Sequence, residues 1–212
     1  MPREPKREFT PVQARSQRTR AKLIEALESL LREGSFEDAT IADIAERAGV
    51  SVGAVYRRFK NKDALIPVLF EIYFERLAEQ RESLPEIDPS VGLREALRVQ
   101  VGAAWRFIQE HGHILRAVQL YSRRHPDLVG QEWEELRAAA RRGARQLLQI
   151  FAEEVKREEL DHASQMIAYL LNTCMLERGL HPNLGISAGM TVSEEAFLDS
   201  VADFAWCWLT QE

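Results

Sequence analysis

The 212-residue sequence lacks the features of membrane, secreted and disulfide-rich proteins. No run approaches the roughly 18 apolar residues that a membrane helix requires, and residues 1–10 are charged, so we expect neither a membrane anchor nor a signal peptide. Only two cysteines occur, Cys174 and Cys207, in apolar helical contexts and without a CxxC pair. We expect both to be reduced core residues of a cytoplasmic protein.

Motifs of catalysis and metal binding are also missing. The sequence has no glycine-rich phosphate loop, no GxSxG elbow and no Cys/His nucleophile pair, which predicts that the protein is not an enzyme. The five histidines form no ligand spacing, so we expect no metal and no cofactor. The pairs Glu134-Glu135 and Glu153-Glu154 are interpreted as solvated helix faces rather than as paired catalytic acids.

Charge is unevenly distributed along the chain. Residues 1–62 hold 13 Lys and Arg against 9 Asp and Glu, a net charge of +4, whereas residues 63–212 carry −9. A basic N-terminal part on an acidic body favours a polyanionic partner for the first part, although chance clustering would produce the same imbalance.

Strand signals are nearly absent and helical periodicity recurs throughout, which predicts an all-α fold. A first helix is expected over 12–33, ended by Gly34. Thr40 is positioned to cap a second helix, with Asp43 completing a capping box. Gly49 is expected to end that helix in a left-handed conformation.

The next helix is unusually short. Ser51 is its expected N-cap, and Val55 and Phe59 point inward four residues apart. Asn61 or Asp63 then begins a longer helix that contains Pro67. Because proline lacks a backbone N–H, either Pro67 falls in the first turn of that helix or the helix bends there.

Two helices joined by a tight glycine turn, the second one short, have the shape of a DNA-binding helix-turn-helix. The small residues of the segment 51–54 would let the second helix approach base edges closely. Tyr56, Arg57 and Arg58 supply donors for phosphate oxygens.

The segment "AERAGVSVGAVYRRFKNKDAL", preceded by "TIADI", resembles the N-terminal domain of the TetR family of transcriptional regulators. The resemblance covers residues 15–77. It implies a three-helix DNA-binding domain, a linking fourth helix, a larger helical ligand-binding domain, and a dimer formed mainly by the last two helices.

The resemblance also implies roles for individual residues. Positions matching those where the family grips phosphates are Thr40, Tyr56 and Lys62. Positions matching the face that enters the major groove are Ser51, Val52, Gly53, Ala54 and Arg57. The chain departs from the family at Ala54, where Thr or Ser is frequent, and at Arg57-Arg58, where a His/aromatic pair is commoner. The added arginines strengthen backbone binding or read a guanine bidentately.

The remainder of the chain is interpreted as a helical body after a break over 83–92. Helical runs are expected over 93–108, ended by "EHGHIL", over 114–121, over 133–155 and over 166–175. A loop over 179–191 precedes a last helix from about Ser193.

Apolar stripes in this body give two further sets of candidates. Residues expected to line an effector cavity, or else to be plain core, are Trp105, Ile108, Leu120, Trp133, Met166 and Tyr169. Residues expected at a dimer interface, or else packed within one subunit, are Leu170, Cys174, Phe197, Phe204 and Trp208.

The sequence thus predicts three parts: an arm and helix-turn-helix domain (1–62), a linker helix (63–82), and an effector-binding and dimerisation domain (83–212). The predicted function is a homodimeric repressor that binds a palindromic double-stranded DNA operator and is released by a small-molecule effector. Two alternatives remain: a ligand-binding or protein-interaction module with a non-functional helix-turn-helix, and a small helical enzyme that uses the C-terminal cavity.

Overall fold

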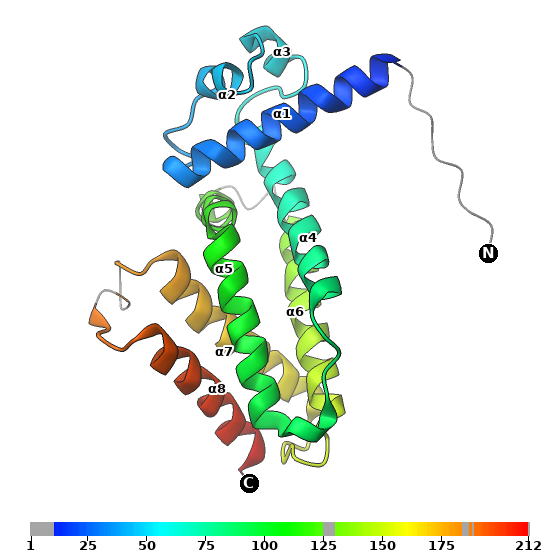
Figure 1. The fold of residues 1–212 in the computed structure, drawn as a ribbon, viewed down its shortest axis with the longest axis vertical. Helices are drawn as coiled ribbons and strands as arrows, with labels where there is room; N and C mark the ends of the chain where they lie inside the picture. The colour runs from blue at the N-terminus through cyan, green and yellow to red at the C-terminus, as the bar shows by residue number, and fades with distance from the viewer. Residues whose placement is uncertain (1–10, 125–129, 184–186, 188, 212) are drawn as a thin grey trace, which may run out of the picture. The chain divides into compact units, whose positions relative to one another are not determined.

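The computed structural model describes residues 11–124, 130–183, 187 and 189–211, and every regular element within them is a helix (Figure 1). The all-α prediction is therefore confirmed. The chain divides into two compact units, Met1–Leu69 (unit 1) and Phe70–Glu212 (unit 2). The boundary falls inside one helix, α4 (Ile66–Ser83). No helix in the described part of the chain is both long and apolar enough to span a membrane.

The described part of unit 1 combines one long helix with short ones around a small apolar core. Its elements before α4 are α1 (Pro11–Glu33), α2 (Ile41–Arg47), α3 (Val52–Tyr56) and the 3-10 turn η1 (Asp63–Leu65). Leu27, Ile44 and Val55 are completely buried where these helices meet, and Phe36 is 1% exposed. Helices α2 and α3, with seven and five residues, depend on the burial of these side chains, because helices of that length are marginal in isolation.

The corner between α2 and α3 follows the local sequence signals. Thr40 caps α2 and forms the expected capping box with Asp43. Gly49 has a φ of 64°, a left-handed conformation that a side chain would disfavour. Ser51 caps α3, accepting a hydrogen bond from the backbone N–H of Ala54 at 3.2 Å. All three expectations are confirmed.

Pro67 lies in the first turn of α4, directly after η1. A proline there removes no helical hydrogen bond, because the first N–H groups of a helix have no partner within it. The first of the two options that the sequence left open is therefore the correct one.

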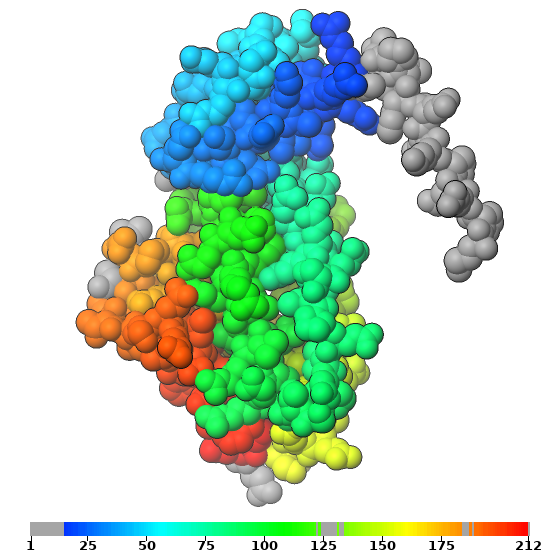
Figure 2. Space-filling view, viewed as in Figure 1, coloured from blue at the N-terminus to red at the C-terminus, as the bar shows by residue number. Residues whose placement is uncertain are grey.

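The described part of unit 2 contains the rest of α4 and four further α-helices. They are α5 (Gly92–Arg124), α6 (Gly130–Ile150), α7 (Leu160–Leu180) and α8 (Glu194–Thr210), and the 3-10 turn η2 (Pro89–Val91) leads into α5. Helix α5 packs against both α7 and α8, and α6 packs against α7. The space-filling view shows α5 between α4 and α8 on one face of this unit (Figure 2).

The predicted helix end at "EHGHIL" is wrong, because α5, which is 33 residues long, passes through this segment without a break. Gly112 of this segment is not a stop signal but a packing position. A Cβ added there would lie 3.1 Å from Leu180 Cδ2 of α7, tighter than most side-chain contacts. The run expected over 133–155 is also too long, since α6 ends at Ile150.

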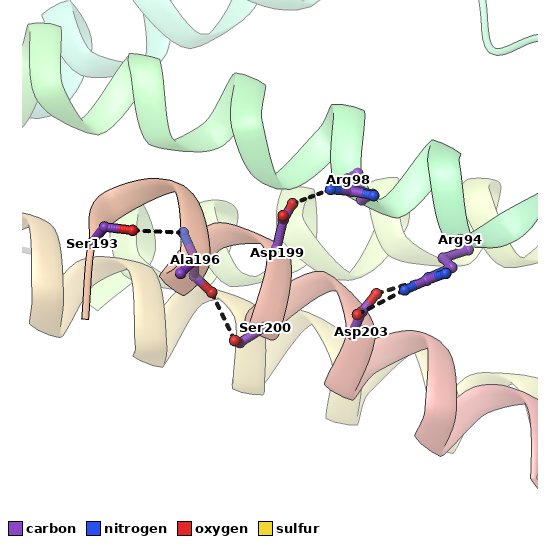
Figure 3. Close-up of polar contacts among 7 residues, drawn as sticks. All are labelled: Arg94, Arg98, Ser193, Ala196, Asp199, Ser200 and Asp203. Atoms are coloured by element: carbon purple, nitrogen blue, oxygen red, sulfur yellow. Dashed lines mark hydrogen bonds and ion pairs between the residues drawn. The ribbon is translucent and has the colours of Figure 1, made fainter.

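Helix α8 is tied to α5 by two parallel ion pairs (Figure 3). Arg94 donates to both carboxylate oxygens of Asp203 at 2.9 Å, and Arg98 donates to Asp199 at 2.5 Å. The arginines lie one turn apart on α5, as the aspartates do on α8. The spacing therefore matches two antiparallel helices in register.

Both cysteines are free thiols. Both were expected in the core, and only Cys207 comes close to that position. Cys207 is half-buried, whereas Cys174 is exposed on α7. The apolar neighbours of Cys174 in sequence suggested a core position, yet they occupy several faces of the helix, so they do not place it inside.

Candidate nucleic-acid interface

The N-terminal end of α3 is exposed to solvent within unit 1. Ser51 and Gly53 are exposed, Val52 is 41% exposed and Ala54 is half-buried. A Cβ added at Gly53 would meet no atom within 4 Å. The predicted groove-entering face is therefore an uncovered surface of small side chains within its own unit.

The opposite side of the same segment anchors α3 to the core. Val55 is fully buried and Phe59 is 8% exposed, as the four-residue spacing predicted. Tyr56 is 54% exposed and Arg57 is also exposed. Among the described residues, neither the Tyr56 hydroxyl nor the Arg57 guanidinium has a hydrogen bond or ion pair with the protein. Both groups are thus available to an external acceptor.

Thr40 is exposed, but its hydroxyl already has partners within the capping box. Its Oγ1 donates to Asp43 Oδ2 at 2.7 Å and accepts from the Asp43 backbone N–H at 3.1 Å. The Thr40 backbone N–H donates to the same carboxylate at 2.8 Å. These side-chain and backbone hydrogen bonds lower the pKa of the Asp43 carboxyl. A phosphate contact through the Thr40 hydroxyl stays a prediction, and it would have to compete with this carboxylate.

Two cations near α3 are already engaged by unit 1. Arg58 Nη1 donates to Ser16 Oγ of α1 at 2.9 Å. Lys62 Nζ donates to the backbone carbonyls of Glu37 and Ala39 at 2.8 and 2.9 Å. Four of the sequence-predicted phosphate donors thus separate into two kinds: Tyr56 and Arg57 are uncommitted, and Arg58 and Lys62 are bound by their own chain.

Sequence reasoning missed the residues that hold α1 against the helix-turn-helix. Arg47 of α2 donates to Ser29 Oγ at 2.8 Å and to Glu33 Oε1 at 2.5 Å, which lowers the pKa of the Glu33 carboxyl. Ser16 binds Arg58 across 42 positions of sequence. No local pattern could reveal these pairs, because each partner alone resembles an ordinary polar surface residue.

The residues predicted to line an effector cavity are only partly brought together. Trp105 and Ile108 are buried on α5, where both face Gly179 of α7. Met166 is half-buried. Leu120 and Tyr169 are 37% and 66% exposed, so the burial expected from their apolar stripes is not found. The side chain of Trp133 lies outside the described residues.

The candidate dimer residues also divide by exposure. Leu170 and Cys174 are exposed one turn apart on α7, and Phe204 on α8 is 77% exposed. Phe197 is buried and packs on Trp105, with ring centroids 5.8 Å apart. Trp208 is half-buried under the guanidinium of Arg157, a cation–π contact within unit 2. Within the described ranges, no three His, Cys, Asp or Glu side chains are close enough to hold a metal ion.

Residues 23–68 match the family model described as "Bacterial regulatory proteins, tetR family". The match runs from α1 into the first turn of α4 and includes the whole corner described above. It therefore covers the part of the chain whose exposed face carries the candidate interface.

Similar proteins agree with this match. The HTH-type transcriptional regulator TtgR of Pseudomonas putida is 42% identical over 89 residues, which are 41% of this chain and 42% of TtgR. The regulator BetI of Escherichia coli is 26% identical over 163 residues, 76% of this chain and 82% of BetI.

Among solved structures, Salmonella enterica GusR superimposes with a TM-score of 0.66 at 18% identity, covering 97% of this chain and all of that one. A similarity at this identity shows the fold alone. The family-model match and the regulators similar in sequence agree: residues 23–68 form a domain of the tetR family of bacterial regulatory proteins.

Proposed function

We propose that the protein is a dimeric repressor that binds a roughly palindromic DNA operator through two copies of α3 and is released by a small effector bound in unit 2. The observation that carries this proposal is the open end of α3, with small residues at its tip and the uncommitted side chains of Tyr56 and Arg57 beside it. A duplex requires close approach of a helix to base edges and donors for phosphate oxygens, and this surface offers both.

Exposed apolar side chains on the last two helices support dimer formation. Leu170 and Phe204 would be costly to leave in water and would be covered if α7 and α8 of two subunits formed a four-helix bundle. Dimers would place two α3 helices on successive major grooves, about 34–36 Å apart. Light scattering of the purified chain should give twice the monomer mass.

A buried polar atom in unit 2 supports an effector that carries a hydrogen-bond acceptor. Trp105 is 5% exposed, and its indole Nε1–H has no partner among the described residues. Buried donors are rarely left unsatisfied, so such an atom calls for an explanation. A largely apolar effector with a carbonyl or hydroxyl oxygen would supply the missing acceptor. By linkage, this effector and the operator must weaken each other's binding by the same factor.

The test is a gel-shift titration of duplex DNA from the region upstream of the protein's own gene, repeated over a range of salt concentrations. Arg57→Met should weaken binding and lower the slope of log K against log salt by about 0.9 for each phosphate that the variant no longer neutralises. Arg142→Met, which removes the same charge from an exposed position of α6, is the matched control and should leave the slope unchanged.

Failure of the wild-type dimer to bind any duplex at low salt would refute the proposal and favour a ligand-binding or protein-interaction module. Native mass spectrometry of the purified chain would detect a copurified small molecule. Release of the operator by that molecule would identify it as the effector.

A further inference from the structure

Lys62 lies between α3 and α4, and its ammonium group is bound by one short segment of unit 1. Nζ donates to the carbonyls of Glu37 and Ala39 and lies 4.8 Å from the ring centroid of Phe36. All three groups belong to the turn over 36–39, which is part of the connection between α1 and α2. The Phe36 ring is itself buried in the core, so the turn is rigidly attached on one side.

These contacts use most of the binding capacity of a lysine ammonium, which has three N–H donors and no acceptor. Two donors satisfy backbone carbonyls of the turn, and the positive charge lies against the face of an aromatic ring. To grip a phosphate, the group would have to share its charge with DNA or leave these partners. Arg57, exposed and uncommitted, has no such partners to leave.

The position of the turn gives the Lys62 contacts a consequence for α2 and α3. Ala39 directly precedes Thr40, the N-cap of α2, and Lys62 directly precedes η1 at the start of the path into α4. The lysine therefore joins the entry of α2 to the segment that leaves α3. Because α2 and α3 are only seven and five residues long, their mutual orientation depends on such connections.

We propose that Lys62 is a positioning residue and not a phosphate ligand: its ammonium holds the turn over 36–39 so that α2 and α3 keep the orientation a duplex requires. The inference rests on the proposed function for its effect on DNA, but not for its effect on the turn. It reassigns a residue for which the family resemblance implied direct phosphate contact.

The experiment compares Lys62→Met with two matched variants, Lys60→Met and Arg57→Met. Lys60 is the same residue type two positions away, exposed and without a side-chain hydrogen bond or ion pair among the described residues. Lys62→Met should speed amide hydrogen exchange over 36–45 in the DNA-free protein, while Lys60→Met leaves this exchange unchanged. Operator affinity of Lys62→Met should fall about tenfold or more, as expected when a charged donor is removed from its partners.

The salt dependence separates positioning from direct contact. If Lys62 positions the turn, Lys62→Met keeps the wild-type slope of log K against log salt, whereas Arg57→Met lowers it by about 0.9 for each phosphate left without its cation. If Lys62 grips phosphate, Lys62→Met lowers the slope in the same way and leaves exchange over 36–45 unchanged. That second result would overturn the inference.

Lys62→Arg keeps the inference testable should the Met variant fold poorly. Arginine retains the charge but replaces a compact ammonium with a planar fork. A positioning role predicts faster exchange over 36–45 and weaker DNA binding at an unchanged slope. Unchanged exchange with full affinity would overturn the inference, because guanidinium is a good phosphate ligand.

If neither the wild-type protein nor any variant binds duplex DNA, the proposed function fails. The exchange data alone then decide whether Lys62 holds the turn.

Discussion

The two units of this chain are stabilised in different ways. In unit 1, α2 and α3 have seven and five residues, far below the length at which a helix is stable in isolation. Side-chain caps at Thr40 and Ser51 and the Lys62 contacts hold them in place. In unit 2, α5 has 33 residues and α7 has 21, and close packing between helices decides their arrangement.

This difference explains why the candidate nucleic-acid interface is exposed at a helix end in unit 1, whereas the candidate effector residues of unit 2 lie among packed helices. Short capped helices can present their ends, with small and polar residues, while burying only one to three side chains each. Long helices bury continuous stripes, so any site between them is surrounded by apolar residues that look like ordinary core. Polar chemistry is therefore easy to locate in unit 1 and hard to locate in unit 2.

The close crossing of α5 and α7 is where unit 2 should be most sensitive to substitution. A Cβ at Gly179 would lie 2.5 Å from Ile108 Cγ2 and 3.3 Å from Trp105 Cζ3. The β-branched Ile108 has little rotamer freedom in a helix, so the helices themselves must separate. We expect Gly179→Ala to lower the free energy of unfolding by about 1–3 kcal/mol, measured by urea denaturation.

Gly143→Ala on α6 is the matched control for this crossing. The nearest atom to its added Cβ would be Arg81 Nη2 at 3.9 Å, an ordinary contact. Relief of the glycine penalty should raise the free energy of unfolding by about 0.5–1 kcal/mol. Equal stabilisation by both substitutions would show that the α5–α7 crossing is not tight.

The two serine caps allow the units to be compared with one substitution. Ser51 of α3 and Ser193 of α8 each accept a hydrogen bond from the alanine three residues later, at 3.2 Å in both cases. Replacing either serine by alanine should cost about 1 kcal/mol of stability. Only Ser51→Ala should also weaken operator binding in a gel shift, because only that cap lies on the candidate interface. A similar loss of affinity in Ser193→Ala would contradict this assignment.

The smallest expected effect is a pH dependence of the α5–α8 pairs. Hydrogen bonds from Arg94 lower the pKa of the Asp203 carboxyl in the folded state. The contribution of this pair is fully present above the unfolded pKa, about 3.9, and is lost as the pH falls through the lower folded value. The wild type should therefore lose stability more steeply than Asp203→Asn when the pH falls below about 5, in urea titrations at several pH values.

Glu75→Gln on α4 is the control for the pH series. Glu75 is exposed and has no ion pair among the described residues. Its replacement should therefore leave the loss of stability at acid pH as steep as in the wild type. If Asp203→Asn and the wild type lose stability equally steeply below about pH 5, the Arg94–Asp203 pair contributes nothing measurable to the free energy of unfolding. That is the common result for exposed pairs.

Much of unit 1 could be predicted from sequence because its signals are local. The Thr40–Asp43 capping box spans four residues, the Gly49 turn is a single backbone conformation, and the Val55–Phe59 pair is one helical turn. Each needs only the neighbouring residues to be recognised. The start of α4 illustrates the limit of this reasoning, since Pro67 allowed two interpretations and only the helix boundary selected one.

The remaining features depend on partners far apart in sequence. Gly112 resembles a helix stop, and it is a packing position only because Leu180 lies against it. Lys62 resembles a free cation, and it is a bound one only because the turn over 36–39 folds back onto it.

For this chain, residue order alone was sufficient for the helical class, the helix-turn-helix corner and the open tip of α3. These depend on backbone propensities and on hydrogen bonds between close neighbours. Folding in three dimensions decided which cations are committed to the protein, which apolar residues are buried, and how far α5 extends. Those outcomes depend on the energy of contacts between distant segments, which no single stretch of sequence contains.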